Sequence, residues 1–164
     1  MKRKTKSTMY QEQAKSIVNE TKAKQLLVAL EKTFHKNEML GAPKKALIFT
    51  ESRRTQEYLK SFLQNNGYKE KVVCFNGSNN DDDSKSIYRK WLSLYAGSKR
   101  ISGRTIIDRK QALVDHFRTD AEIMIATESG AEGINLQFCS LLVNYDMPWN
   151  PQRIEQRIGR CHRY

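Results

Sequence analysis

Four short runs of apolar residues constrain the fold more than any other feature of this sequence. They occupy residues 46–49, 72–75, 123–126 and 141–143, and no polar residue interrupts any of them. Such continuous runs are typical of strands that are buried on both faces, as in a parallel sheet covered by helices. Helical patterns separate the first three runs. The sequence therefore predicts an α/β fold in which helices flank a mainly parallel central sheet.

The longest helical pattern covers about residues 11–35, where Leu26, Leu27 and Leu30 repeat at helical spacing, and Gly41 ends it. Residues 1–10, which precede it, are expected to form a basic flexible arm. Further helices are predicted up to Gly67, from Ser84 onward, from Thr105 to about Phe117, and from Asn150 onward. For the last helix the alternative is an early end at Gly159, which would place Arg163 on a loop.

Two of these helices have recognisable start signals. The residues before Ser84 are three acids, Asp81, Asp82 and Asp83. Their negative charges would stabilise the positive N-terminal end of that helix. Thr105 and Asp108 have the spacing of a capping box, with Asp in place of the usual Glu or Gln.

The net charge of the chain points to a polyanionic partner. Its 164 residues include 29 Lys and Arg against 18 Asp and Glu, which gives +11. This length suits one domain with a real core. Nucleic acid is the first partner to consider and an acidic membrane surface the second, while a solvated lysine-rich surface remains the alternative.

Several classes of protein do not fit the composition. No stretch approaches 18 consecutive apolar residues, so the sequence predicts no membrane span. The three cysteines have no Cys-x-x-Cys spacing and the three histidines are scattered, which argues against a metal site and for a reducing compartment. A cytoplasmic protein is expected, associated with the nucleoid if it is bacterial.

A polar and basic segment, residues 76–104, interrupts the alternation of strands and helices. Its second half is a basic loop over residues 97–104, with Lys99, Arg100 and Arg104 as candidate contacts to a nucleic acid backbone. A flexible solvated loop is the equal alternative.

The residues after the third apolar run form a loop rich in small side chains. Residues 123–137 read IMIATESGAEGINLQ, with Gly130 and Gly133 in the loop. Glycines allow a backbone to approach a ligand closely, and the C-terminal end of a parallel strand is where α/β sheets bind ligands. An ordinary strand-to-helix turn is the competing interpretation.

The last fifteen residues read NPQRIEQRIGRCHRY and carry a stripe of arginines. On a helix, an apolar face would contain Ile154, Ile158 and Cys161, and the opposite face would contain Gln156, Arg160 and Arg163. The planar guanidinium group suits the recognition of phosphate.

Three segments together resemble the C-terminal RecA-like lobe of superfamily 2 helicases and translocases. KALIFTES (residues 45–52) resembles motif IV, ATESGAEGINLQ (residues 126–137) resembles motif V, and NYDMPWNPQRIEQRIGRCHR (residues 144–163) resembles the strand leading into motif VI. The resemblance is greatest to the Swi/Snf-like branch, especially its bacterial RNA-polymerase-associated members. It implies a three-layer RecA-like, P-loop-NTPase-like fold over residues 11–164, with an insertion near residues 76–104.

The resemblance also implies a role for each motif residue. Arg160 and Arg163 would be arginine fingers that reach ATP and Mg²⁺ held mainly by an N-terminal lobe, and such a finger accelerates phosphoryl transfer about 10³–10⁵-fold. Gln156, Gly133 and Asn135 would lie near the nucleotide. Thr127 and Glu128 would face the nucleic acid backbone.

Two functions are compatible with these motifs. The chain has neither a Gly-Lys dipeptide nor an Asp-Glu dipeptide, so it has no Walker A lysine motif and no helicase acidic box. We therefore expect an excised lobe of an ATP-dependent translocase or helicase that is inactive alone and acts on nucleic acid, foremost double-stranded DNA, alongside other DNA-processing proteins. The alternative is a non-catalytic, basic nucleic-acid-binding module.

Overall fold

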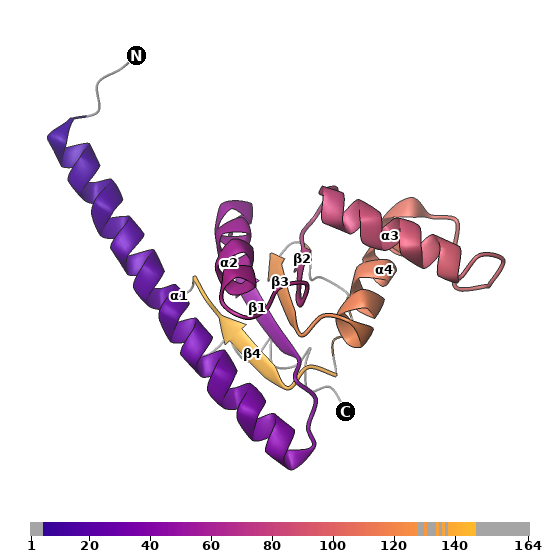
Figure 1. Cartoon of the computed structure of the whole chain (residues 1–164). Coiled ribbons are helices and arrows are strands. Elements are labelled where there is room, and N and C mark those ends of the chain that lie inside the picture. The colour runs from indigo at the N-terminus through magenta and orange to yellow at the C-terminus, as the bar shows by residue number, and fades with distance from the viewer. Residues whose placement is uncertain (1–4, 128–129, 131–133, 135, 137, 147–164) are drawn as a thin grey trace.

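The computed structural model describes residues 5–127, 130, 134, 136 and 138–146 (Figure 1). Its sheet contains, in the order of their pairing, β2 (Val72–Phe75), β3 (Ile123–Thr127), β1 (Ala46–Thr50) and β4 (Leu141–Asn144). All three pairings are parallel. The predicted parallel sheet is therefore confirmed, and the bounds of each strand differ from those of its apolar run by at most one residue.

The described part of the chain contains four helices: α1 (Lys6–Leu40), α2 (Arg53–Asn65), α3 (Asp82–Leu94) and α4 (Thr105–Thr119). α1 and α2 pack on one face of the sheet and α4 packs on the other. Alternate residues of β1 serve opposite faces, since Ile48 packs with α1 and α2 whereas Phe49 packs with α4. α3 lies over α4, farther from the sheet (Figure 1). The three-layer arrangement explains why each strand contains a continuous apolar run.

α1 is longer than the sequence pattern predicted. It begins at Lys6, so residues 6–10 are helical and the prediction of a flexible arm is wrong for them. Long unbranched side chains such as Lys and Gln favour helix, and no Gly or Pro stops the helix before Gly41. Gly41 ends it as predicted, in the left-handed conformation with φ of 68°. The N-terminal half of α1 extends past the sheet (Figure 1).

The predicted start signal of α3 is confirmed, but the helix begins two residues earlier than expected. α3 begins at Asp82, and the Asp81 carboxylate caps it by accepting a hydrogen bond from the Ser84 amide at 2.9 Å. Burial alone would raise the pKa of Asp81, but the hydrogen bonds from the Ser84 side chain and backbone hold this pKa below its usual value.

The capping box predicted at the start of α4 is wrong. Thr105 is already helical, and Arg104 precedes it without a side-chain capping bond. The Asp108 carboxylate reaches further back, where it accepts hydrogen bonds from the Ser102 amide at 3.0 Å and the Gly103 amide at 3.1 Å. It thus fixes the end of the basic loop and not the helix cap.

The helix predicted from Asn150 onward lies outside the described residues. Among the helices that the structure describes, none is long and apolar enough to cross a membrane.

Candidate nucleotide and nucleic-acid edge of the sheet

Because the strands are parallel, the loops that follow them lie along one edge of the sheet. Thr50 and Thr127 end β1 and β3 and are paired in register. After β1 the chain turns directly into α2, whose N-cap is Ser52, and the Ser52 hydroxyl accepts a hydrogen bond from the Thr55 amide at 3.1 Å. This places the positive end of a helix dipole at the same edge.

Asparagine side chains hold the loop after β2. The Asn76 Oδ1 accepts hydrogen bonds from the amides of Ser78 at 3.1 Å and Asn79 at 2.8 Å. The Asn79 Oδ1 in turn accepts one from the Asn76 amide at 2.8 Å, with Asn79 in the left-handed conformation at φ of 48°. The loop is thus held by its own side chains before any ligand binds.

The loops after β2 and β3 are in direct contact at Gly130. A Cβ atom at this position would lie 2.7 Å from the carbonyl carbon and from the Cα of Asn76, so only glycine fits there. The Gly130 amide donates to the Thr127 carbonyl at 3.1 Å. The small-residue loop predicted from the sequence therefore includes one glycine that is required for close backbone approach.

The Gln56 side chain of α2 connects β2 and β3 near their C-terminal ends. Its Nε2 donates to the carbonyl of Phe75 at 3.0 Å and to that of Ile125 at 2.6 Å, while its Oε1 accepts from the side-chain Nδ2 of Asn76 at 3.3 Å. The side chain is only 2% exposed, so these bonds form in a low dielectric and are correspondingly strong.

Thr127 is the one predicted nucleic-acid contact of motif V that lies within the described residues. It is 6% exposed, and its hydroxyl has no hydrogen-bond partner among those residues. A buried hydroxyl without a partner costs about 1–3 kcal/mol. Thr127 therefore places an unsatisfied polar atom at the edge of the sheet where the strands end.

Two arginines that the sequence analysis did not single out also lie at this edge. Arg53, the first residue of α2, donates from Nη2 to the Ser78 hydroxyl at 2.7 Å. Arg109 of α4 makes long contacts of 3.5 Å to the Asn79 carbonyl and the Asn80 side chain, and its guanidinium lies over the Tyr88 ring, 5.5 Å from its centre. Its Nε is buried and has no hydrogen-bond partner among the described residues. Arg53 comes shortly after a predicted strand, so its position at this edge could have been predicted. Arg109 lies inside a helix, and no local sequence pattern marks it.

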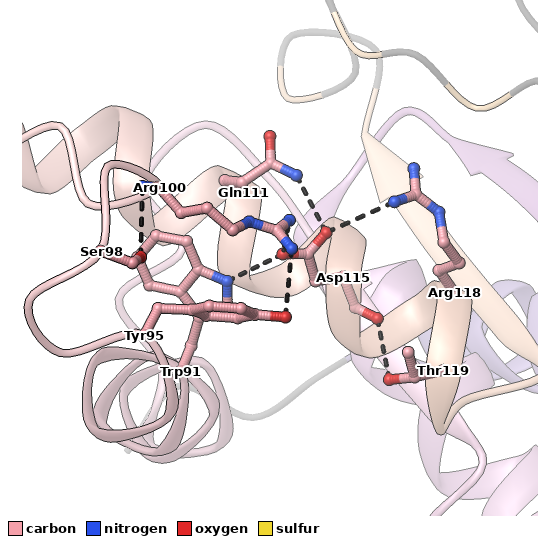
Figure 2. Close-up of polar contacts among 8 residues, drawn as sticks. All are labelled: Trp91, Tyr95, Ser98, Arg100, Gln111, Asp115, Arg118 and Thr119. Carbon is pink, nitrogen blue, oxygen red and sulfur yellow. Dashed lines mark hydrogen bonds and ion pairs between the residues drawn. The ribbon is translucent and has the colours of Figure 1, made fainter.

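The basic loop is anchored to α4 by Asp115 (Figure 2). The Asp115 carboxylate accepts hydrogen bonds from Trp91 Nε1 at 2.8 Å and Gln111 Nε2 at 3.0 Å, and it pairs with Arg100 Nη2 at 2.6 Å. The Arg100 guanidinium also lies over the Tyr95 ring, 4.4 Å from its centre. The loop is therefore pinned in place by its own arginine.

The three basic candidates of this loop differ in their surroundings. All three side chains are exposed, but the Arg100 guanidinium pairs with Asp115. A nucleic-acid role for all three stays a prediction, and in this arrangement Lys99 and Arg104 are the groups free to face a backbone phosphate.

The remaining predicted site residues lie outside the described residues: Glu128, Gly133, Asn135, Gln156, Arg160 and Arg163. Within the part of the chain that the structure describes, no group of three His, Cys, Asp or Glu side chains is placed to hold a metal ion.

Residues 21–164 match the model of the helicase conserved C-terminal domain. The chain belongs to this family. Its RecA-like fold class, predicted from the motifs, agrees with this membership and with the parallel sheet.

Curated relatives support the predicted branch. The chain is 45% identical over 119 residues to the uncharacterized ATP-dependent helicase YqhH of Bacillus subtilis. This alignment covers 73% of this chain and 16% of that protein. It is 31% identical over 122 residues to helicase SWR1 of Saccharomyces cerevisiae (73% and 6%), and 44% identical over 63 residues to the RNA polymerase-associated protein RapA of Cronobacter sakazakii (37% and 6%). The resemblance to the Swi/Snf-like branch with its bacterial RNA-polymerase-associated members is confirmed, and the chain spans a small part of each relative's length.

Proposed function

We propose that this chain is the second, C-terminal lobe of an ATP-dependent DNA translocase or helicase. The observation that carries the proposal is the family match over residues 21–164, combined with a sheet whose strand-end loops converge on one edge. In this proposal the edge faces both the nucleotide and the nucleic acid, and an N-terminal lobe of the same protein holds most of the ATP and its Mg²⁺.

The catalytic contribution of this lobe is charge stabilisation. Arg160 and Arg163 would reach the phosphates of ATP, where a positive fork stabilises the charge that develops during phosphoryl transfer. Gln156, Gly133 and Asn135 would position the nucleotide. No described residue of this chain is needed as a nucleophile or a general base in this scheme.

The protein would contact the backbone phosphates of the nucleic acid and not the edges of its bases. Thr127 and Glu128 at the end of β3, together with Lys99 and Arg104 of the basic loop, are the proposed contacts. The loop after β2 is held by hydrogen bonds between Asn76 and Asn79, so little ordering of this loop would be needed on binding. Double-stranded DNA, tracked without strand separation, is the proposed substrate because the relatives belong to the Swi/Snf-like branch.

The experiment that tests this proposal measures DNA-stimulated ATP turnover of the full-length protein with Arg160→Ala. We expect kcat to fall by about 10³–10⁵, because the transition state loses its finger. The matched control is Arg89→Ala on the exposed side of α3, which should keep normal turnover. Normal kcat in the Arg160 variant would refute the finger assignment.

The non-catalytic alternative predicts a different result. A basic binding module should bind DNA with the isolated chain alone, and its affinity should fall steeply with salt. It should also leave ATP turnover of the full-length protein unaffected by Arg160→Ala. The two functions are therefore separated by one variant.

A further inference from the structure

The N-terminal half of α1 reaches beyond the body of the lobe. Burial in this helix begins at Ala23, and every residue from 5 to 22 is exposed. The match to the helicase family model begins at residue 21, almost at the same point. Two independent boundaries, one of packing and one of sequence similarity, therefore separate residues 6–20 from the lobe that the family model describes. These residues are called the projecting half of α1.

The projecting half extends past the edge of the sheet where the strands end. The C-terminal end of α1 leads into the start of β1, whereas Asn19 lies beside the end of β4. There the hydroxyl of Tyr145, the first residue after β4, donates to the Asn19 carbonyl at 3.2 Å, and the Lys22 ammonium lies over the Tyr145 ring, 5.7 Å from its centre. The helix before Asn19 thus lies on the side of the sheet that is proposed to face the nucleotide (Figure 1).

One face of the projecting half is apolar although solvent surrounds it. Tyr10, Ile17 and Val18 are 69%, 64% and 54% exposed. With Ala14 they follow the spacing i, i+4, i+7 and i+8, which places them on one face of the helix. A hollow of about 330 Å³, lined by Ala14, Lys15, Val18 and Asn19, lies beside this face. A contiguous apolar face of this kind marks a surface that another protein body covers.

The charges around this face indicate the chemistry of the partner. Residues 6–24 contain two glutamates and four lysines, the lysines at positions 6, 15, 22 and 24. A second copy of this helix would bring the same excess of positive charge against itself, which disfavours self-association. Nucleic acid would match the lysines, but its phosphates gain nothing from exposed isoleucine and valine. An apolar protein surface with an acidic rim matches both features.

We propose that the projecting half of α1 docks on the N-terminal lobe of the same protein, on an apolar surface with an acidic rim. The inference rests on the proposed function, which places that lobe across the edge where the strands end. A body bound across this edge reaches the helix before Asn19, because that part of the helix already extends beyond the sheet. Docking would join the two lobes at a contact separate from the nucleotide.

The test is photocrosslinking in the full-length protein, with benzoylphenylalanine in place of Ile17 and double-stranded DNA present. Isotopically light and heavy copies are mixed, so that mass spectrometry separates crosslinks within one copy from those between copies. We expect crosslinks within one copy, to peptides of the N-terminal lobe that contain Asp or Glu. The control carries the same probe in place of Val28, which is 48% exposed on the part of α1 that packs on the sheet, and it should crosslink to that lobe several-fold less.

Four results of this experiment would overturn the proposal. They are crosslinks from position 17 mainly to DNA, crosslinks mainly between copies, no crosslink to the N-terminal lobe, and equal crosslinking to that lobe from positions 17 and 28.

Two further variants test the acidic rim, with the probe now in place of Tyr10. Ile17→Glu and Ile17→Lys both remove an apolar contact, but only glutamate adds repulsion from acidic groups. We therefore expect Ile17→Glu to lower the crosslink yield several-fold more than Ile17→Lys. Equal losses, or a greater loss with Ile17→Lys, would contradict an acidic rim.

Failure of this inference can be told apart from failure of the proposed function. DNA-stimulated turnover that depends on Arg160, with no crosslink from position 17, would leave the motor assignment intact and remove only the docking surface. A full-length protein without ATP turnover would remove both.

Discussion

At the scale of single residues, Asp115 determines how the basic loop is held. Its carboxylate is 11% exposed and receives donors from α3, from the loop and from α4 itself. A helical aspartate in the sequence carries no sign of this role, because Trp91 and Arg100 reach it from outside its own helix, whereas Gln111 and Arg118 are ordinary neighbours on α4. The loop that looked free to grip phosphate is thus partly committed to the fold.

Replacing Asp115 with alanine should therefore destabilise the chain. Trp91 and Arg100 would lose their acceptor, and the half-exposed Arg100 limits the cost to about 1–3 kcal/mol in the free energy of unfolding. Urea unfolding followed by tryptophan fluorescence measures the change. The control is Asp120→Ala, whose carboxylate is 68% exposed and should change stability little. Equal effects of the two variants would disprove the anchoring role.

Gly130 provides a sharper steric test at the ligand edge. Gly130→Ala should cost about 1–3 kcal/mol, because the added Cβ meets the rigid Asn76 backbone at 2.7 Å. Gly67→Ala is the comparison: its φ of 102° is also unfavourable for alanine, but the space around it is open. Thermal unfolding should rank the Gly130 variant as the less stable. A milder effect at Gly130 than at Gly67 would argue against the contact between the two loops.

His116 should make stability sensitive to acid. Burial lowers the pKa of His116 below its usual value, and the nearby Asp120 only partly opposes this effect. The unfolded chain therefore binds the proton more readily, so stability should fall as the pH drops below about 6.5, where the unfolded imidazole titrates. Urea midpoints between neutral and mildly acidic pH should show this loss, and His116→Gln should reduce it. An identical pH dependence in the variant would exclude His116 as its source.

At the scale of elements, α1 divides into two parts with different energetic roles. Its buried residues begin at Ala23 and include Leu30, which is fully buried against the sheet, whereas Ile17 in the projecting half is 64% exposed. Packing against the sheet, and not helix propensity, should supply most of the stabilisation from this helix.

This division predicts unequal effects of two alanine substitutions on the same helix. Leu30→Ala should cost about 2–5 kcal/mol through lost burial and the cavity left behind. Ile17→Ala should change the free energy of unfolding by no more than about 0.5 kcal/mol, as for other surface substitutions. Chemical denaturation of both variants decides the matter, and a large loss for Ile17→Ala would mean that the projecting half packs against something.

The elements also show what a sequence can predict here. The strands were predictable because residues such as Ile48 and Phe49 serve opposite apolar layers, which leaves a continuous apolar run. The start of α1 was missed because an exposed helix needs no apolar stripe. The capping at α4 was misassigned because Asp108 can reach several donors, and only the loop geometry selects Ser102 and Gly103.

The candidate site was predictable to a different extent. Motif spacing identified the family, and Thr127 lies at the expected strand end. Arg109 and Gln56 escaped notice because their partners come from distant segments that only the parallel sheet brings together. Tertiary contacts of this kind leave no periodic signal along the chain.

At the scale of the whole molecule, charged groups of both signs gather where the strands end. Arg53, Arg109 and the N-terminus of α2 lie there, together with the Asp146 carboxylate, which accepts a hydrogen bond from the Glu51 amide at 2.7 Å. The basic groups of this edge are the ones that suit phosphates.

The most direct measurement of the central claim compares ATP turnover of this 164-residue chain with that of the full-length protein, each with and without double-stranded DNA. A lobe that only supplies arginine fingers should show negligible turnover alone, whereas the full-length protein should hydrolyse ATP faster when DNA is present. DNA-stimulated turnover by the isolated chain at the full-length rate, or no turnover by the full-length protein, would contradict the assignment of this chain as half of an ATP-dependent motor.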